Sequence, residues 1–186
     1  MSIMRPQKKP PARSTAHGSA WYAWRVRQQL QAGGENLLVV KRPTVLNQGY
    51  LTLGRDCVLR SDLHRLRLAV SPGARLQIGD RVHLHGAIIA ATTDIRIGND
   101  TWLAPYAHLM DSDFHDLQDR TQAGQSAPIR IGERVKIGAR VIILRGVSIG
   151  DDAEIAPASL VTKDIPAGAY ASGVPAKVQS IRSPSD

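Results

Sequence analysis

Residues 131–165 read IGERVKIGARVIILRGVSIGDDAEIAPASLVTKDI and place an aliphatic residue at every sixth position. These positions are Ile131, Ile137, Ile143, Ile149, Ile155 and Val161. A period of six fits neither an amphipathic helix nor a simple hairpin, and it is the hexapeptide pattern of a parallel β-helix. Three hexads form one coil and return the chain to the same edge, so equivalent side chains stack from coil to coil. The stretch therefore predicts a triangular solenoid with an aliphatic core.

The same period extends toward the N-terminus and is broken once by a long insertion. Earlier coils start at Ile78 and Ile97, a step close to the one from Ile131 to Ile149. The step from Ile97 to Ile131 is nearly twice as long. The additional residues fall at about 114–128, FHDLQDRTQAGQSAP, a polar segment typical of a projecting loop. A loop anchored on a rigid solenoid is a suitable place for a catalytic residue, and His115 stands at its start.

The chain is expected to form one all-β domain with a helical cap. The predicted boundaries are 1–19 for a basic, disordered-like tail, 20–44 for an N-terminal helix and linker, and 45–182 for the β-helix with its inserted loop. Within the second part, residues 20–31 are predicted to be helical, with Trp21, Trp24 and Leu30 on one face. A solenoid needs such a cap because its first coil exposes apolar surface.

Composition restricts the class of protein. No apolar run approaches the roughly 20 residues of a membrane span, and the N-terminus lacks the apolar stretch of a secretory signal. Cys57 is the only cysteine, which excludes an internal disulfide. We therefore expect a cytoplasmic protein.

The positive charge is concentrated in the N-terminal part of the chain. Residues 1–77 hold 13 Lys/Arg and three Asp/Glu, a net charge of +10, whereas the whole chain carries +8. This part is either a solvated basic surface or a surface attracted to an acidic glycan or phospholipid. Nucleic acid is not expected as a partner, because no recognised binding module is present and the basic strands carry few aromatic residues.

Four segments resemble one enzyme family. They are IGDRVHLHGAIIA, IRIGNDTWLAPYAHLMDSDFHDL, the stretch 129–168 that ends in VTKDIPAG, and ASGVPAKV near the C-terminus. The chain is similar to the hexapeptide-repeat O-acetyltransferases, in the branch of the galactoside, maltose, exopolysaccharide and nodulation-factor acetyltransferases. The resemblance implies a left-handed parallel β-helix, a homotrimer, and acetyl-CoA bound in a groove between neighbouring prisms. It also implies a saccharide hydroxyl as acceptor, in polysaccharide biosynthesis.

The resemblance assigns the catalytic role to His115. In the family a histidine of this loop is the general base that takes the proton from the acceptor hydroxyl as its oxygen attacks the acetyl thioester. Imidazole suits this role because it accepts and returns a proton near neutral pH. Asp113 either orients His115, as a carboxylate does in triads, or forms the turn at the loop start.

The resemblance also implies binding residues for the acceptor and the coenzyme. The expected acceptor-binding residues are His85 and Trp102, and the expected coenzyme-binding residues are Ala139, Pro157, Thr162, Lys163 and Lys177. The two lysines suit the phosphates of the coenzyme. Two residues depart from the family pattern: Pro157 has no N–H to donate, and Lys136 stands where many relatives carry a tryptophan.

Three other functions stay open from the sequence. In the first, the acceptor is the amino group of an aminosugar instead of a hydroxyl. In the second, the chain is a metalloenzyme of the γ-carbonic anhydrase type, in which histidines of two subunits bind a metal. In the third, the chain is a non-catalytic β-helix that binds a ligand. Four histidines are available for the second alternative, namely His64, His83, His85 and His108. Because the loop and the GVPAK segment fit acyl transfer better, no metal is expected.

Overall fold

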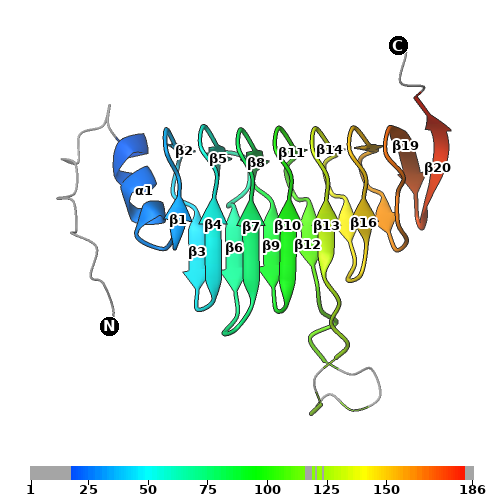
Figure 1. Ribbon diagram of the computed structural model, residues 1–186, viewed down its shortest axis with the longest axis horizontal. Helices are drawn as coiled ribbons and strands as arrows, with labels where there is room; N and C mark the ends of the chain where they lie inside the picture. The colour runs from blue at the N-terminus through cyan, green and yellow to red at the C-terminus, as the bar shows by residue number, and fades with distance from the viewer. Residues whose placement is uncertain (1–17, 116–118, 120, 123, 183–186) are drawn as a thin grey trace.

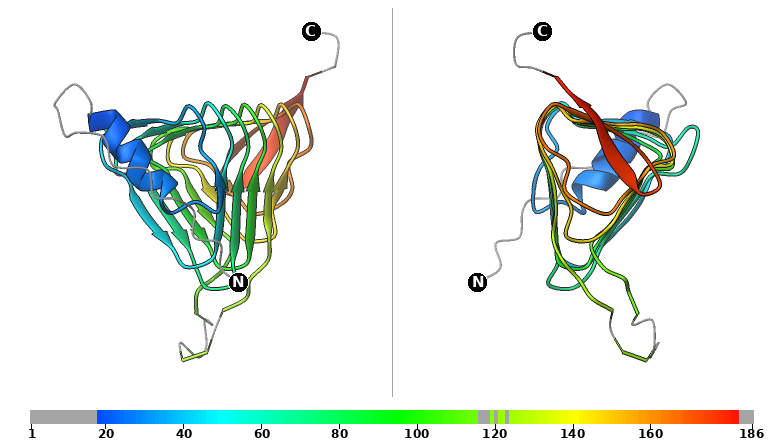
Figure 2. Two further views of the ribbon diagram at one scale, coloured as in Figure 1. Left: turned by 60° about the vertical axis from the view of Figure 1, so that its left-hand side comes forward. Right: turned by 90° about the vertical axis from the view of Figure 1, so that its right-hand side faces the viewer.

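The protein is a triangular prism built from three β-sheets that run the length of the molecule (Figure 1; Figure 2). This computed structural model describes residues 18–115, 119, 121, 122 and 124–182. Each coil adds one strand to each sheet, and nearly all strands pair in parallel. The predicted all-β fold is confirmed as a left-handed parallel β-helix, an exception to the right-handed rule for parallel crossovers.

We name the sheets A, B and C in the order in which a coil passes through them. Sheet A contains β1 (Ala32–Gly33), β4 (Tyr50–Leu53), β7 (Arg75–Ile78), β10 (Asp94–Ile97), β13 (Ile129–Ile131) and β16 (Ser148–Ile149). Sheet B contains β2 (Leu38–Val40), β5 (Val58–Arg60), β8 (His83–His85), β11 (Trp102–Leu103), β14 (Lys136–Ile137), β17 (Glu154–Ile155), β19 (Ala169–Gly173) and β20 (Ala176–Ile181). Sheet C contains β3 (Thr44–Asn47), β6 (Arg67–Val70), β9 (Ile88–Ala91), β12 (His108–Met110), β15 (Ile142–Ile143) and β18 (Leu160–Val161).

The core is the set of aliphatic columns that the period predicts. In sheet A, Ile97 pairs in register with Ile78 of one neighbouring strand and with Ile131 of the other. All the aliphatic residues of the repeat in 131–165 are buried, which confirms that they point inward. Where a glycine follows the aliphatic residue in sheet A it has a packing reason, since a Cβ on Gly98 would lie 2.4 Å from a carbonyl oxygen of the next coil.

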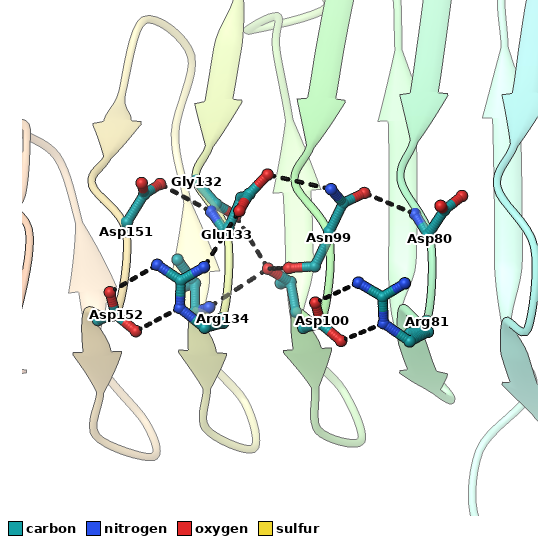
Figure 3. Close-up of polar contacts among 11 residues, drawn as sticks. Asp80, Arg81, Asn99, Asp100, Gly132, Glu133, Arg134, Asp151 and Asp152 are labelled. Atoms are coloured by element: carbon teal, nitrogen blue, oxygen red, sulfur yellow. Dashed lines mark hydrogen bonds and ion pairs between the residues drawn. The ribbon is translucent and has the colours of Figure 1, made fainter.

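The chain turns between sheets at three corners, which we call AB, BC and CA. At the AB corner the backbone is left-handed at residues other than glycine, including Arg81, Asp100, Arg134 and Asp152 with φ of 54–60°. These four side chains form two ion pairs across neighbouring coils, in which Arg81 binds Asp100 at 2.6 Å and Arg134 binds Asp152 at 2.7 Å (Figure 3). The pairing compensates part of the strain of the left-handed backbone.

A second row of polar side chains joins the coils at the same corner. The amide oxygen of Asn99 accepts a hydrogen bond from the Asp80 N–H at 2.8 Å, and its amide nitrogen donates to Glu133 at 3.0 Å (Figure 3). Asp151 accepts the Glu133 N–H at 2.8 Å. We call the two ion pairs and this second row together the AB ladder. Its members provide hydrogen-bond and ion-pair partners for one another along the prism.

The N-terminal helix is present, but its bounds and its buried face differ from the prediction. Helix α1 spans Gly18–Arg27 and covers the N-terminal end of the prism (Figure 1). Its buried residues are Ala23 and Val26, whereas Trp21 and Trp24 are only half-buried. Small side chains on the inner face let the helix approach the first coil closely, and the large indoles lie at its sides.

The solenoid begins at Ala32, well before the predicted start at residue 45. Strands β1 and β2 each pair in parallel with the next coil, although they carry few aliphatic residues in the hexapeptide pattern. The chain joins the sheet when the Gln31 N–H donates to the Leu51 carbonyl at 2.9 Å. The residue before the edge strand β1 thus donates to a carbonyl of β4 that would otherwise be unpaired.

The C-terminal end is closed by the antiparallel hairpin of β19 and β20, and the GVPAK segment forms its turn and the start of β20 (Figure 2). The predicted tail lies almost wholly outside the described residues. Among the residues that are described, no helix has the length and the apolar character required to cross a bilayer.

Candidate active site

The inserted loop leaves the prism at the CA corner, between β12 and β13, and projects away from it (Figure 1). Asp111 anchors its first residues. This carboxylate is fully buried and accepts hydrogen bonds of 2.7–2.9 Å from the backbone and hydroxyl groups of Thr92 and Thr93 and from the Asp94 N–H. A buried carboxylate requires this number of donors, so the network fixes the position at which the loop starts.

A short antiparallel ribbon continues the anchor. Ser112 bridges Ser126, and the Asp113 N–H donates to the Gln125 carbonyl at 2.9 Å. The ribbon brings Gly124 against the backbone of His115, where an added Cβ would lie 2.7 Å from the His115 carbonyl oxygen. The described ends of the loop are therefore closely packed at its base, and only small residues fit between them.

His115 lies at the outer end of this ribbon with an exposed side chain. Its N–H donates to the Asp113 carbonyl at 2.7 Å, and the preceding Phe114 has a left-handed backbone with φ of 60°. The Phe114 N–H is held by the Ser112 hydroxyl at 2.9 Å. The backbone of His115 is thus fixed while its imidazole stays accessible to a ligand.

Asp113 binds a different partner from the one suggested by the sequence. Its carboxylate accepts from Arg145 Nε at 2.7 Å, and Arg145 belongs to the next coil at the same corner. Asp113 contacts His115 through its backbone carbonyl. The carboxylate therefore joins the loop to the solenoid instead of orienting the imidazole, because a half-buried guanidinium is the stronger partner for a charged oxygen.

Two further predicted residues lie at the CA corner. Thr162 and Lys163 follow β18 and are exposed. Lys163 stands one full coil after Arg145, so the two cations occupy equivalent positions in successive coils. Asp164 holds this turn by accepting the Ser148 N–H at 2.7 Å. The CA corner thus carries an exposed imidazole and, further along the prism, an exposed ammonium group.

The other predicted coenzyme residues lie at the BC corner, on the opposite edge of sheet C. Ala139 and Pro157 belong to successive coils there, and the Ala158 N–H donates to the Ala139 carbonyl at 2.8 Å. Lys177 is exposed on β20, opposite Ser172 of β19. Because the Gly173 N–H binds the Ser159 hydroxyl at 3.2 Å, the hairpin that carries Lys177 is tied to this corner.

The predicted acceptor residues lie on the outer face of sheet B. His85 and Trp102 contact each other edge to face, with ring centroids 5.6 Å apart. Burial first, and then the electrostatic influence of Arg60 and His83, hold the pKa of His85 below its usual value, which favours the neutral imidazole. Within one chain these rings do not share a face with His115, which projects from the CA corner.

The four histidines considered for a metal are dispersed. His64 contacts the Gly86 carbonyl at 2.9 Å and stacks on Tyr106, whereas His108 lies on sheet C and the other two lie on sheet B. Within the part of the chain that the structure describes, no three His, Cys, Asp or Glu side chains of one subunit are placed to hold a metal ion.

Asp111 and Arg145 are site residues that the sequence reasoning did not find. Asp111 had a detectable signal: it is a charged residue directly after the pair Met110–Ala90, and in the coil before the residue after this pair is the buried Ala91. The sequence signal for Arg145 was weaker and consisted of its spacing of one full coil from Lys163.

The sequence matches known proteins over most of its length. The family described as Bacterial transferase hexapeptide (six repeats) matches residues 128–163. The galactoside O-acetyltransferase of Escherichia coli (strain K12) is 31% identical over 144 residues, which cover 75% of this chain and 68% of that protein. Nodulation protein L of Rhizobium meliloti (strain 1021) is 34% identical over 137 residues, which cover 72% of each chain.

Solved structures share the fold. A hexapeptide-repeat acetyltransferase from Vibrio cholerae O1 biovar eltor, complexed with acetyl-coenzyme A, is 21% identical with a TM-score of 0.57, over 87% of this chain and 75% of that chain. A variant of the N-acyltransferase AntD from Bacillus cereus, in complex with dTDP-4-amino-4,6-dideoxyglucose and coenzyme A, is 17% identical with a TM-score of 0.61, over 85% and 87% of the two chains. These structures show the fold, and the sequence matches show that the chain is an acyltransferase of the hexapeptide-repeat O-acetyltransferase family.

Proposed function

We propose that the protein transfers the acetyl group of acetyl-CoA to a hydroxyl of a saccharide or glycan precursor, with His115 as general base. The observation that carries the proposal is the CA corner, where an anchored loop presents an exposed imidazole and a later coil carries the exposed Lys163. The relative from Escherichia coli, which matches most of the chain, is named a galactoside O-acetyltransferase.

The proposed reaction is a direct transfer. The acceptor oxygen attacks the thioester carbonyl while the His115 imidazole takes the hydroxyl proton. The tetrahedral intermediate then collapses with cleavage of the C–S bond, and the imidazolium returns the proton to the departing sulfur. The products are the acetyl ester and coenzyme A with a free thiol, and the imidazole is regenerated. A positioned base of this kind contributes roughly 10²–10⁴-fold to the rate.

The coenzyme groove is proposed to lie between two chains of a homotrimer. The residues matched to the family's coenzyme site divide between the CA corner (Thr162 and Lys163) and the BC corner (Ala139, Pro157 and Lys177). A trimer with sheet C toward its three-fold axis brings the CA corner of one chain to the BC corner of the next. The coenzyme residues of the two corners then line one groove.

The outer face of sheet C supports this arrangement, because its C-terminal part is largely apolar. The strand register aligns Ile88, His108, Ile142 and Leu160 along it, and Ile142 has 37% of its surface exposed. A row of aliphatic side chains on an otherwise charged molecule is typical of an interface between subunits. The proposal includes a cytoplasmic location, since the single cysteine is unpaired and buried.

The first test is calorimetric titration of the full-length protein with acetyl-CoA. We expect binding in the micromolar range that weakens by about tenfold or more in Lys163→Ala/Lys177→Ala, because two cations that contact phosphates are lost. The control is Arg55→Ala/Arg81→Ala, which removes two charges from the AB corner. Absence of binding by the folded wild type would overturn the proposed function.

Activity assays follow once binding is established. Acceptors are offered as matched pairs that differ only in the reacting group, such as glucose and glucosamine. Transfer to the hydroxyl member that depends on His115 supports the proposal. Preference for the amine would replace the O-acetyl assignment with transfer to an aminosugar.

A further inference from the structure

A hollow of about 260 Å³ lies at the N-terminal end of the prism, between helix α1 and β3, the edge strand of sheet C. One part of its wall is apolar and includes Val26, Pro43 and Val45. The other part carries three arginine side chains, Arg25, Arg42 and Arg65. These arginines come from α1, from the segment before β3 and from the segment before β6, so the fold brings them together from three places in the sequence.

The positive charge of this hollow is not neutralised by the described part of the chain. No Asp or Glu lines the hollow, and within the described residues none of the three arginines forms an ion pair. The carboxylate of Asp62 is bound to Arg60, and that of Asp56 accepts the Asn36 amide at the AB corner.

The segment that precedes helix α1 supplies no side-chain carboxylate either. In the sequence, positions 1–17 include Arg5, Lys8, Lys9 and Arg13 but no Asp or Glu. Three guanidinium groups that face one hollow repel each other, and an anion between them relieves that repulsion.

One arginine is held in place before any ligand arrives. The Arg25 guanidinium lies 5.1 Å from the ring centroid of Trp21, a cation–π contact. Stacking uses the face of the guanidinium and leaves its N–H edge free to donate. Arg25 therefore loses less conformational entropy on binding an anion than an unsupported surface arginine does.

We propose that this hollow binds an oxyanion, a phosphate or carboxylate group, on a small organic molecule whose body lies on the apolar wall. Guanidinium groups match both groups through paired N–H donors, and such charge-assisted bonds are stronger than neutral ones. The apolar wall adds a contact surface for the organic part of the ligand, which a free ion does not have. The ligand class is thus a small phosphorylated or carboxylated organic molecule rather than an uncharged one, and a sugar phosphate and a sugar acid serve as probes of the two anions.

The site is separate from the acetyl-transfer site. In sheet C, β3 is three strands from β12, the strand that leads into the His115 loop, which corresponds to roughly 14 Å at the usual strand spacing. The inference therefore goes beyond the proposed function, and a binding measurement tests it whether or not the protein transfers acetyl groups.

Titrations of the full chain with inorganic phosphate, glucose 1-phosphate and glucuronate test the proposal, with tryptophan fluorescence and calorimetry as readouts. Trp21 is in contact with Arg25 and reports binding directly. We expect at least one probe to bind with an affinity that falls as salt is added. Arg42→Ala/Arg65→Ala should weaken that binding by about tenfold or more, because two charge-assisted contacts are lost. Arg55→Ala/Arg81→Ala removes the same charge from the AB corner and should bind as the wild type does.

The three probes identify the source of the anion. Equal binding of phosphate and glucose 1-phosphate assigns the site to the phosphate group alone, whereas tighter binding of glucose 1-phosphate or of glucuronate assigns it to the charged sugar. Binding of no probe up to about 10 mM, a very weak affinity, overturns the proposal. Equal weakening in both double variants also overturns it, because the effect then reflects net charge. Unfolding midpoints of both variants confirm that each one is folded.

Discussion

The AB and CA corners are built by the same coils but use their charged side chains in opposite ways. At the AB corner charged side chains pair with those of the neighbouring coil, as in the Arg134–Asp152 pair at 2.7 Å (Figure 3). At the CA corner the period is interrupted, and the exposed His115 stands on a ribbon held by Asp111 and Arg145. Regular stacking satisfies polar groups within the prism, and the interruption supplies a group that is free to act on a ligand.

The largest expected effect is that of His115→Ala. If the imidazole is the general base, the variant should lose roughly 10²–10⁴-fold in kcat. Its affinity for acetyl-CoA and its unfolding midpoint should not change, because the side chain is exposed and has no structural role in the described contacts. Steady-state kinetics with calorimetry separates the two quantities. A variant that keeps more than about half of the wild-type kcat would remove His115 from the mechanism.

Asp111→Asn should give the largest loss of stability at the CA corner. In the wild type the carboxylate accepts hydrogen bonds from N–H and hydroxyl groups. The amide of asparagine would point its own N–H donors at some of these groups, so we expect the free energy of unfolding to fall by about 3 kcal/mol. Urea unfolding measures it. Asp152→Asn at the AB corner is the matched control and should have a far smaller effect, because Asp152 is exposed. Equal losses would mean that the two corners do not differ in the way described.

Arg145→Ala should act on catalysis through position. Loss of the bond to Asp113 frees the ribbon that carries His115, and kcat should fall roughly ten- to a hundredfold while the affinity for acetyl-CoA changes little. Arg145→Lys should restore part of kcat, since an ammonium group still pairs with the carboxylate. Arg134→Ala, which breaks a pair of the AB ladder, should leave kcat unchanged. A fall in acetyl-CoA affinity equal to the fall in kcat would show instead that Arg145 binds the coenzyme.

The smallest expected effect is the acid sensitivity of the half-buried Arg60–Asp62 pair at the end of β5. The hydrogen bond from Arg60 lowers the pKa of Asp62 to about 2, from 3.8. Because the folded-state pKa is the lower one, the contribution to stability is present above pH 3.8 and is lost as pH falls toward about 2. Unfolding midpoints of the wild type and of Asp62→Asn should therefore converge over this interval. A constant difference down to the lowest pH would show that the pair does not form.

The sequence was sufficient for the repeating parts of the molecule and for the place of its interruption. Aliphatic residues at a fixed period, such as Ile131 and Ile137, have only one arrangement that stacks them, so the columns and the loop position followed from spacing. The first coil was missed because Ala32 and Gly33 form a strand by edge pairing and not by a hydrophobic pattern. A strand that forms through backbone hydrogen bonds, without a hydrophobic pattern, is hard to recognise in the amino-acid sequence.

The partner of Asp113 was not predictable for a related reason. The residue two places away in the sequence, His115, is the natural candidate, but Arg145 lies 32 residues on and reaches the carboxylate only when the coils are stacked and the loop is closed. The N-terminal hollow is a second case, since Arg25, Arg42 and Arg65 look like scattered surface charge until α1 is packed on the first coil. Both arrangements depend on tertiary register, which spacing alone does not give.

Mixed trimers test most directly the central claim, that the CA corner of one chain and the BC corner of its neighbour form one active site. His115→Ala and Lys177→Glu chains are each inactive in the proposed mechanism at limiting acetyl-CoA, the first at the CA corner and the second at the BC corner. Co-expressed in equal amounts, they should recover about one quarter of the wild-type activity, because one site in four then combines two intact halves from different chains. Activity no higher than that of the separate variants would contradict the shared site and place both halves in a single chain.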